Sequence, residues 1–327
     1  MTPDEAAFES QVVEWLVDQG GYQAVKVGVA QEQTDFDPVR GIDTAELFAF
    51  IGATQAEAWD RLAGLHGGVP GAQSKFVERL AKELDARGTV DVLRHGVVDL
   101  GVMIRLAFFA PAHGLTPVLR ERYEANRLTV TRQLPYQDGS TKALDLCLFV
   151  NGLPVATAEL KNQLTGQSVE HAMEQYRTDR DPANVTLAKR AVVHFAVDTH
   201  RVAMTTRLAG ADTRFLPFNR GDGMGAGNPV VEGKQRTSYL WERVWQRDAW
   251  LDLLARFIHV EQPAKGSKDA PVTIFPRFHQ WDAVLRMEAD ARANGPGQSY
   301  LVQHSAGSGK SNTIAWLAHR LSSLHDD

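Results

Sequence analysis

The chain has 327 residues, 43% of them hydrophobic and 23% charged, and a formal net charge of −5. This composition is ordinary for a folded protein of about two domains, and the modest acidity confines any nucleic-acid contact to local basic patches. The single cysteine, Cys147, excludes a disulfide framework and a cysteine-based zinc site. We find neither a signal peptide nor a stretch of about 18 apolar residues, so we expect a cytoplasmic protein without a membrane span.

The first third of the chain is predicted to be largely helical. A helix is expected at residues 3–19, with Thr2 as its cap and Pro3 in its first turn. Phe8 and Val12 lie on one apolar face of this helix. Further helices are expected at about 44–63, 74–87 and 113–126. The apolar stretch 97–109 is consistent with a buried strand, but its pattern does not decide the type of element.

A two-residue period then predicts strands, interrupted by few helices. The expected strands are 127–132, 144–150, 153–160, 191–197 and 202–206, and the expected helices are 168–179 and 248–259. Asn151-Gly152 is a strong signal for a tight turn that joins strands 144–150 and 153–160 into a hairpin. The glycine-rich run within residues 221–229 predicts a flexible surface loop.

The C-terminal segment carries a phosphate-binding loop. We expect a polar linker at 261–271, a helix to about 292, a short strand at 300–302 and a final helix at about 312–322. In the loop, residues 303–311, glycines turn backbone N–H groups toward phosphates, Lys310 supplies positive charge and Ser311 offers a hydroxyl to Mg²⁺. The further strands and acidic motif of a nucleotide motor do not follow, so we expect the front part of a larger NTP-driven machine.

Two acidic residues and a lysine gather at one end of the predicted hairpin. Asp145 lies on its first strand, and Glu159 and Lys161 share a face at the end of its second strand. Paired carboxylates of this kind bind Mg²⁺, which polarises a phosphodiester and activates a bound water. Lys161 would stabilise the charge that develops on the phosphate, and the backbone carbonyl of Leu160 is a further candidate metal ligand.

The alternative interpretation is a solvated, salt-bridged face, because Glu-x-Lys alone is a very weak motif. Apolar neighbours on both strands favour a buried hairpin: Leu144, Leu146, Leu148, Val150, Val155, Ala156 and Ala158. Charged side chains are rarely buried without a reason. The residues alone leave the two interpretations about equally supported.

Several segments, in this order, carry a family resemblance: 149–154, 159–162, 175–177, 193–197, 215–219, 276–280 and 304–311. Together they resemble the restriction (motor–nuclease) subunit of type I restriction–modification enzymes. The resemblance implies an α/β fold: a PD-(D/E)xK restriction-endonuclease-like domain with added helices, followed by the incomplete start of a RecA-like P-loop lobe. The implied boundaries are a nuclease domain at 1–260 with its core at about 110–210, a linker at 261–271, and the truncated start of a superfamily 2 translocase lobe at 272–327.

The resemblance also implies roles for individual residues. It assigns the nuclease motif to Asp145, Glu159 and Lys161, the two carboxylates being ligands of Mg²⁺. The family often has a Gln-x-x-x-Tyr element after the lysine; Tyr176 fits its second position, Ala172 occupies the first, and Gln175 is the candidate substitute. Glu9 is the candidate for an acid that the family's nuclease places near the first helix.

For nucleotide binding, the resemblance implies an adenine-reading glutamine motif and the phosphate loop. The residues assigned to ATP are Arg277, Gln280, Gly307, Gly309, Lys310 and Ser311, with Ser311 on the Mg²⁺ of the nucleotide. Because the acidic motor motif is missing, we expect no ATP hydrolysis by this chain. Because the short strand before the loop lacks neighbouring parallel strands, we expect weak or absent ATP binding.

The expected activity is therefore that of the endonuclease subunit of a type I site-specific deoxyribonuclease. It would hydrolyse double-stranded DNA with Mg²⁺, coupled in the full family to ATP-driven DNA translocation, with methyltransferase and specificity subunits as partners. The alternative is a catalytically inactive, truncated remnant that only binds DNA or partner subunits.

Overall fold

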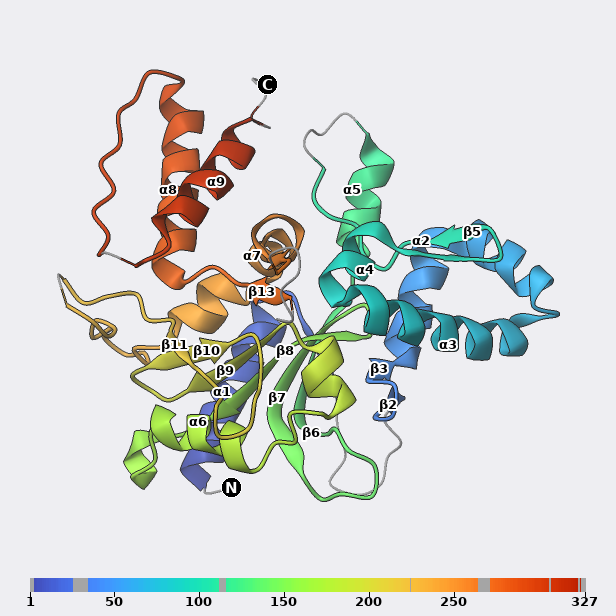
Figure 1. Cartoon of the computed structure of the whole chain (residues 1–327), viewed down its shortest axis with the longest axis horizontal. Coiled ribbons are helices and arrows are strands. Elements are labelled where there is room, and N and C mark those ends of the chain that lie inside the picture. The colour runs from blue at the N-terminus through green and yellow to red at the C-terminus, as the bar shows by residue number, and fades with distance from the viewer. Residues whose placement is uncertain are drawn as a thin grey trace.

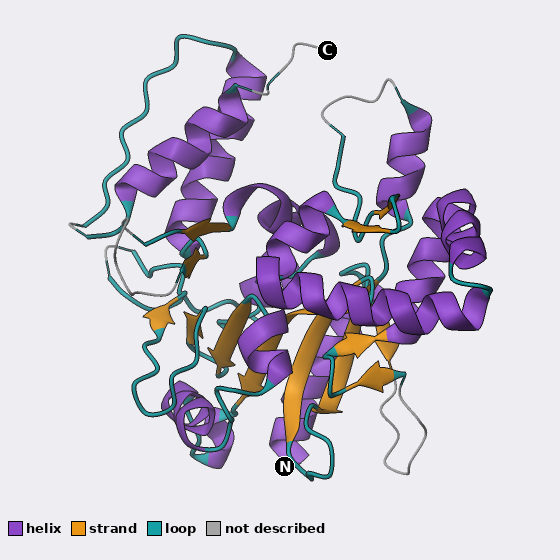
Figure 2. Ribbon diagram, turned by 45° about the vertical axis from the view of Figure 1, so that its right-hand side comes forward, coloured by secondary structure: helices purple, strands orange, loops and turns teal. Residues whose placement is uncertain are grey.

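The fold is a mixed α/β arrangement around one central sheet (Figures 1 and 2). The computed structural model describes residues 3–25, 35–111, 116–223, 225–263, 271–305, 307–322 and 324. Thr2, the predicted cap of the first helix, lies outside this part of the chain. No helix in these ranges is long and apolar enough to cross a membrane.

The central sheet has seven strands in the order β1-β6-β7-β8-β9-β10-β11. Their bounds are β1 Gln23–Val25, β6 Leu128–Pro135, β7 Ala143–Val150, β8 Leu153–Leu160, β9 Val193–Val197, β10 Val202–Thr205 and β11 Leu216–Pro217. The β1/β6 and β8/β9 pairs are parallel and the other pairs are antiparallel. Every residue of β8 is buried, which confirms the predicted buried hairpin and agrees with its largely apolar sequence.

The turn between β7 and β8 follows the sequence prediction. Asn151 and Gly152 have φ values of 51° and 82°, the left-handed conformation that a two-residue hairpin turn requires. Gly152 also lies against another segment, since a Cβ atom there would come within 2.2 Å of the Asp43 carbonyl oxygen. The Asn151 side chain accepts a hydrogen bond from the Arg127 N–H and donates one to the Leu106 carbonyl. These contacts fix the hairpin relative to its neighbours.

Helices cover both faces of the sheet. The larger core lies between one face and α1 (Pro3–Asp18), together with the π-helical turn η3 (Leu240–Val244) and α7 (Arg247–Asp252). The other face is covered by α6 (Val169–Thr178) and the π-helical turn η2 (Thr186–Arg190). The glycine-rich segment 221–229 is a loop, as predicted, with Met224 outside the described residues.

A helical arm extends beside the sheet (Figure 1). It contains α2 (Thr44–Leu65), α3 (Val69–Arg87), α4 (Thr89–His95) and, beyond a small hairpin, α5 (Pro117–Glu124). The stretch 97–109 begins with that hairpin, β4 (Val97–Asp99) and β5 (Val102–Ile104), which resolves the ambiguity of its sequence. A second small hairpin, β2 (Phe36–Asp37) with β3 (Ile42–Asp43), precedes α2.

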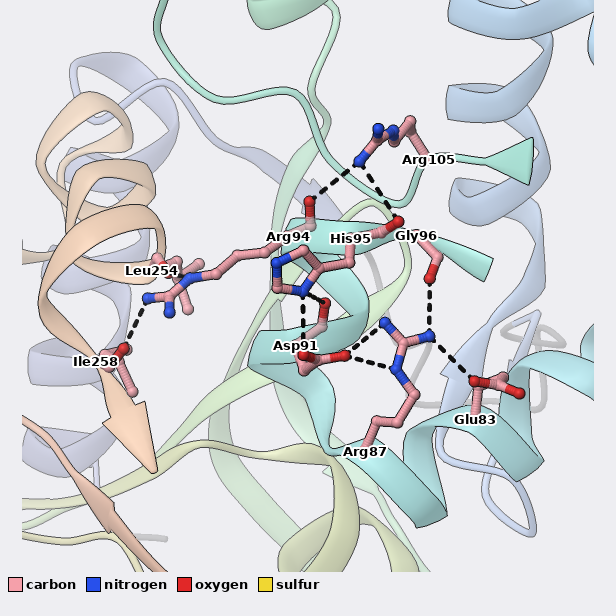
Figure 3. A network of polar contacts seen from close by, with 9 residues as sticks. All are labelled: Glu83, Arg87, Asp91, Arg94, His95, Gly96, Arg105, Leu254 and Ile258. Carbon is pink, nitrogen blue, oxygen red and sulfur yellow. Dashed lines mark hydrogen bonds and ion pairs between the residues drawn. The ribbon is translucent and has the colours of Figure 1, made fainter. Parts of the chain in front are cut away.

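An arginine network joins this arm to the rest of the molecule (Figure 3). Arg94 of α4 donates hydrogen bonds of 2.8 and 2.7 Å to the carbonyls of Leu254 and Ile258, at the π-helical turn η4 (Leu253–Phe257). Arg87 forms ion pairs with Glu83 and Asp91 on the same side. Because Arg94 satisfies carbonyls at the end of η4, the contact caps that turn.

The C-terminal segment forms a helical pair, α8 (Phe278–Asn294) and α9 (Lys310–Leu321), drawn in orange and red in Figure 1. It is docked on η4: the Trp316 indole donates a hydrogen bond to the Phe257 carbonyl, and Arg320 forms an ion pair with Asp252. Of the expected linker, residues 264–270 lie outside the described part, while β12 (His259–Glu261) pairs with β13 (Val272–Ile274) on either side.

One predicted element is wrong. Residues 300–303 are not a strand, because among the described residues no strand pairs with them through ladder hydrogen bonds. Leu301 is correspondingly 95% exposed. The apolar pattern of 300–302 is therefore present without the neighbouring strands that would make it a buried parallel strand.

Candidate functional site

The open end of the β7–β8 hairpin brings Asp145 and Glu159 together. Leu146 pairs with Ala158 in the ladder, so the same register places Asp145 opposite Glu159. The Asp145 carboxylate Oδ2 accepts a hydrogen bond of 2.8 Å from the Leu160 N–H. The Nζ atom of Lys161 lies 4.0 Å from the same oxygen. The structure thus assembles the three residues that the sequence pattern selected.

Glu159 is the most deeply buried member of this group. Its side chain has 0% exposure, and its Oε1 accepts a hydrogen bond of 2.7 Å from Arg180 Nε. Its Oε2 is buried without a hydrogen-bond partner among the described residues. Burial, with the negative charge of Asp145 nearby, raises the pKa of Glu159 to about 8, although Arg180 and Lys161 oppose the shift. This carboxylate is therefore poised to gain from a positive charge at Oε2.

Asp145 and Lys161 are reachable from solvent, unlike Glu159. Their side chains keep 14% and 13% exposure. The site therefore combines a fully buried carboxylate, Glu159, with a carboxylate and an ammonium group that are partly accessible to solvent.

Glu9 of α1 reaches the same site through a bridging amide. The Gln133 Nε2 donates hydrogen bonds of 2.9 Å to Glu9 Oε2 and 3.3 Å to Asp145 Oδ1. Arg132 forms an ion pair with the other oxygen of Glu9, which is buried. Glu9, the helix acid selected from the sequence, is thus connected to Asp145 only indirectly, through Gln133.

Gln133 has an unusual backbone for a strand residue. Its φ is 48°, and it interrupts the β6–β7 ladder between the Arg132–Leu146 and Leu134–Leu144 pairs, opposite Asp145. A non-glycine residue in the left-handed region costs about 1–2 kcal/mol. Such strain is typical of functional sites, where the surrounding structure enforces it.

Tyr176 is fully buried and therefore presents no surface to solvent. Its hydroxyl shares a hydrogen bond of 2.7 Å with Thr157, whose hydroxyl also lies 2.8 Å from His194 Nδ1. All three are buried, and burial lowers the pKa of His194 to about 4, which keeps this imidazole neutral at pH 7. The neighbouring Gln175 is half-buried on α6, and no described contact joins its side chain to the three hairpin residues.

Sequence reasoning missed Arg180 and Gln133. Arg180 follows α6 by two residues, and its charge was visible only as one of many basic residues in that region. Gln133 belongs to a strand whose predicted end was residue 132. The two-residue period continues past residue 132, and this pattern could have shown that the strand includes Gln133. No feature of the sequence indicates the left-handed backbone of Gln133.

The residues present fit a divalent metal ion of the Mg²⁺ type. Asp145 and Glu159 offer carboxylate oxygens, and the partnerless Glu159 Oε2 is the kind of buried acceptor that a cation would satisfy. Mg²⁺ binds through one or two carboxylates and keeps several waters, so two carboxylates are sufficient. The described residues contain no group of three or more His, Cys, Asp or Glu side chains arranged for a metal.

The phosphate loop precedes α9, whose N-cap is Gly309. Gly307 and Gly309 have φ values of 73° and 81°, and Lys310 donates hydrogen bonds to the carbonyls of His304 and Ser305 at 3.1 and 2.9 Å. Ser311 lies exposed in the first turn of the helix. The loop's lysine therefore bonds to the loop itself.

Gln280 and Arg277 stand next to this loop. The Gln280 Oε1 accepts a hydrogen bond from the Arg277 N–H, and its Nε2 donates one to the Gly309 carbonyl, both at 2.8 Å. A cleft of about 360 Å³ opens beside them and is also lined by Arg214 and Leu216 from the sheet edge. Of the residues expected to bind ATP, Arg277, Gln280, Gly307 and Gly309 line this cleft, whereas Lys310 and Ser311 are not among its lining residues.

Comparison with known proteins finds a family model that matches one segment of the chain. Residues 118–213 match the family model described as type I restriction enzyme R protein N terminus. The chain is R-subunit-like. The endonuclease subunit of the HindI type I restriction enzyme from Haemophilus influenzae is 23% identical over 215 residues, which cover 62% of this chain and 19% of that subunit. The aligned part of this R-subunit-like chain therefore spans about a fifth of its relative.

The matched segment contains the hairpin site of this R-subunit-like protein. Asp145, Glu159 and Lys161 fall within residues 118–213, as do Gln133 and Arg180, which the structure adds. Glu9 and the phosphate loop lie outside that segment. The match to the family model thus bears on the hairpin and not on the loop.

Proposed function

We propose that the hairpin site is a PD-(D/E)xK nuclease centre that hydrolyses phosphodiesters of double-stranded DNA. The observation that carries the proposal is the convergence of Asp145 and Glu159, with Lys161 4.0 Å from Asp145 Oδ2, inside an R-protein segment. A salt-bridged surface, the alternative interpretation of the sequence, does not account for a fully buried Glu159 with one partnerless oxygen.

Each residue has a distinct task in this proposal. Asp145 and Glu159 Oε2 would hold Mg²⁺, which when bound supplies Lewis acidity to the scissile phosphate and a more acidic water. Asp145 is oriented by the Leu160 N–H and, more weakly, by Gln133. Lys161, whose side chain is partly accessible to solvent, would attract the phosphate and stabilise the negative charge that grows on it in the transition state.

The wider role follows the family. We infer that residues 1–260 form the nuclease domain and that 272–327 belong to a RecA-like translocase lobe, in which Lys310 and Ser311 contact ATP and bind it only weakly. In that role the chain acts on DNA with methyltransferase and specificity subunits of a type I restriction–modification complex. The left-handed backbone of Gly307 and Gly309 and the position of Gln280 beside Gly309 support a nucleotide site, and the name of the HindI relative supports the restriction context.

The test is cleavage of supercoiled plasmid with Mg²⁺ or Mn²⁺ by the wild type, Asp145→Ala and Glu159→Ala. Glu174→Gln is the matched control, because Glu174 is an exposed acid on α6 away from the site. The proposal predicts cleavage by wild type and control only, with loss on adding a chelator. Equal cleavage by all variants would refute the site, and no cleavage by any, with partner subunits present, would favour a non-catalytic DNA-binding role.

A further inference from the structure

Arg180 is a buried arginine that forms an ion pair with Glu159 of the candidate site. Its side chain keeps only 4% exposure, and its Nε lies 2.7 Å from Glu159 Oε1. A second guanidinium nitrogen donates a hydrogen bond of 2.7 Å to the Ala143 carbonyl. The guanidinium carbon also lies 5.6 Å from the centroid of the Tyr136 ring. Three separate contacts therefore fix the orientation of this group.

The contacts of Arg180 lie on both strands that carry the two carboxylates. Ala143 begins β7 two residues before Asp145, and Glu159 lies at the end of β8. Arg180 thus ties together the two strand ends that carry the acids. A guanidinium suits this task because its planar fork presents donors in fixed directions to two acceptors, whereas an ammonium group is a single point charge.

The way in which Arg180 binds Glu159 is informative. It occupies one carboxylate oxygen, Oε1, and leaves Oε2 buried without a hydrogen-bond partner among the described residues. A purely structural ion pair would be more stable with hydrogen bonds to both carboxylate oxygens. A buried acceptor without a hydrogen bond costs about 1–3 kcal/mol of folding free energy. The orphaned oxygen is accounted for if it is reserved for a ligand.

We propose that Arg180 is a positioning residue for metal binding, holding Glu159 through Oε1 so that Oε2 is presented to a divalent cation beside Asp145. The proposal rests on the proposed nuclease function, which supplies the cation. Arg180 does not contact the metal or the DNA in this account. It acts as do the outer partners of metal-ligating side chains elsewhere, whose loss typically costs about 10–100-fold in metal affinity or activity.

The experiment is a calorimetric titration of the full chain with Mn²⁺ in the absence of DNA. Arg180→Gln should weaken Mn²⁺ binding by about tenfold or more, and Arg180→Lys should restore part of the loss because it returns the charge without the fork. Arg177→Gln is the control, since Arg177 is an arginine of α6 that contacts Phe215 and the Thr213 carbonyl instead. In a Glu159→Gln background, Arg180→Gln should cause no further loss.

The possible results separate the two proposals. If the wild type binds Mn²⁺ and Arg180→Gln binds it equally well or more tightly, the role of Arg180 is refuted while the nuclease proposal stands. If the wild type binds no Mn²⁺, both fail. Should Arg180→Gln not fold, Arg180→Lys carries the test: an affinity equal to wild type would overturn the proposal, and a weaker one at similar thermal stability would support it.

Discussion

At the scale of single residues, the site depends on side chains held in costly states. Glu159 is fully buried and paired with Arg180, and Gln133 keeps a left-handed backbone inside a strand. Each state costs folding free energy that a relaxed alternative would avoid. Their concentration around Asp145 indicates that the local geometry serves a function other than stability.

The backbone of Gln133 yields a stability prediction. Gln133→Gly and Gln133→Ala both remove the amide that bridges Glu9 and Asp145, but only glycine tolerates a φ of 48° without strain. The glycine variant should therefore be more stable by about 1 kcal/mol, the reverse of the usual order in a strand. Urea denaturation of the two variants measures the difference; equal stabilities would contradict the left-handed assignment.

His194 predicts a loss of stability in acid. Its pKa in the folded protein is about 4, below the 6.5 expected when unfolded, so protons bind preferentially to the unfolded chain. This contribution is fully present above pH 6.5 and is lost as the pH falls toward 4, by up to about 3 kcal/mol. The urea midpoint of the wild type should fall when the pH is lowered from about 7.5 to about 5, a range set by these two pKa values. The fall should be smaller in His194→Gln than in the wild type. An equal fall in both would contradict burial as a neutral imidazole.

At the scale of elements, the β7–β8 hairpin is the unit that builds the site. Its turn at Asn151 and Gly152 sets the register, and the register places Asp145 opposite Glu159 at the far end of the hairpin. A slip of one residue would send each side chain to the other face of the sheet. The turn is thus a remote determinant of the site.

Gly152→Ala should accordingly be strongly destabilising. A Cβ atom would meet the Asp43 carbonyl at 2.2 Å, in addition to the strain of a φ of 82°. Gly139→Ala is a matched control, because Gly139 has a φ of 67° and no described atom within 4 Å of the added carbon. We expect a loss of about 1 kcal/mol for the control and at least about twice that for Gly152→Ala. Thermal unfolding of the two variants checks this; equal losses would show that the close approach is absent.

The elements that could be predicted were those with local signals. Signals within a few residues predict the Asn-Gly turn, the alternating strands and the first helix, which begins with a proline. The turn and the strands together also predicted that Asp145 and Glu159 lie close together. Arg180 and Gln133 could not be assigned, because their roles arise from contacts between segments distant in sequence. The strand expected at 300–302 failed for the converse reason: its apolar pattern is local, but a strand needs a neighbour.

At the scale of the whole molecule, the phosphate loop and the hairpin site belong to one packed structure. Helix α9, which starts at Lys310, is docked on η4 through Trp316 and Arg320. The same turn η4 receives Arg94 from the helical arm. The loop is thus fixed at its helical end, whereas its other flank, residues 300–303, pairs with no described strand.

This asymmetry predicts weak nucleotide binding. A nucleotide must displace the contacts of Lys310 with the loop carbonyls, and the unpaired flank does not preorganise the loop. Calorimetry with MgATP should give a dissociation constant above about 1 mM, equivalent to about 4 kcal/mol of binding free energy or less. Micromolar binding that disappears in Lys310→Ala would contradict this.

The central claim is that the open end of the β7–β8 hairpin is a metal-dependent nuclease site. Anomalous scattering from a Mn²⁺-soaked crystal of the chain tests it most directly. The account predicts one strong peak bound by Asp145 and by Glu159 Oε2, with Arg180 still on Oε1. A crystal that holds Mn²⁺ elsewhere but none at this position, at concentrations that support plasmid cleavage, would contradict it.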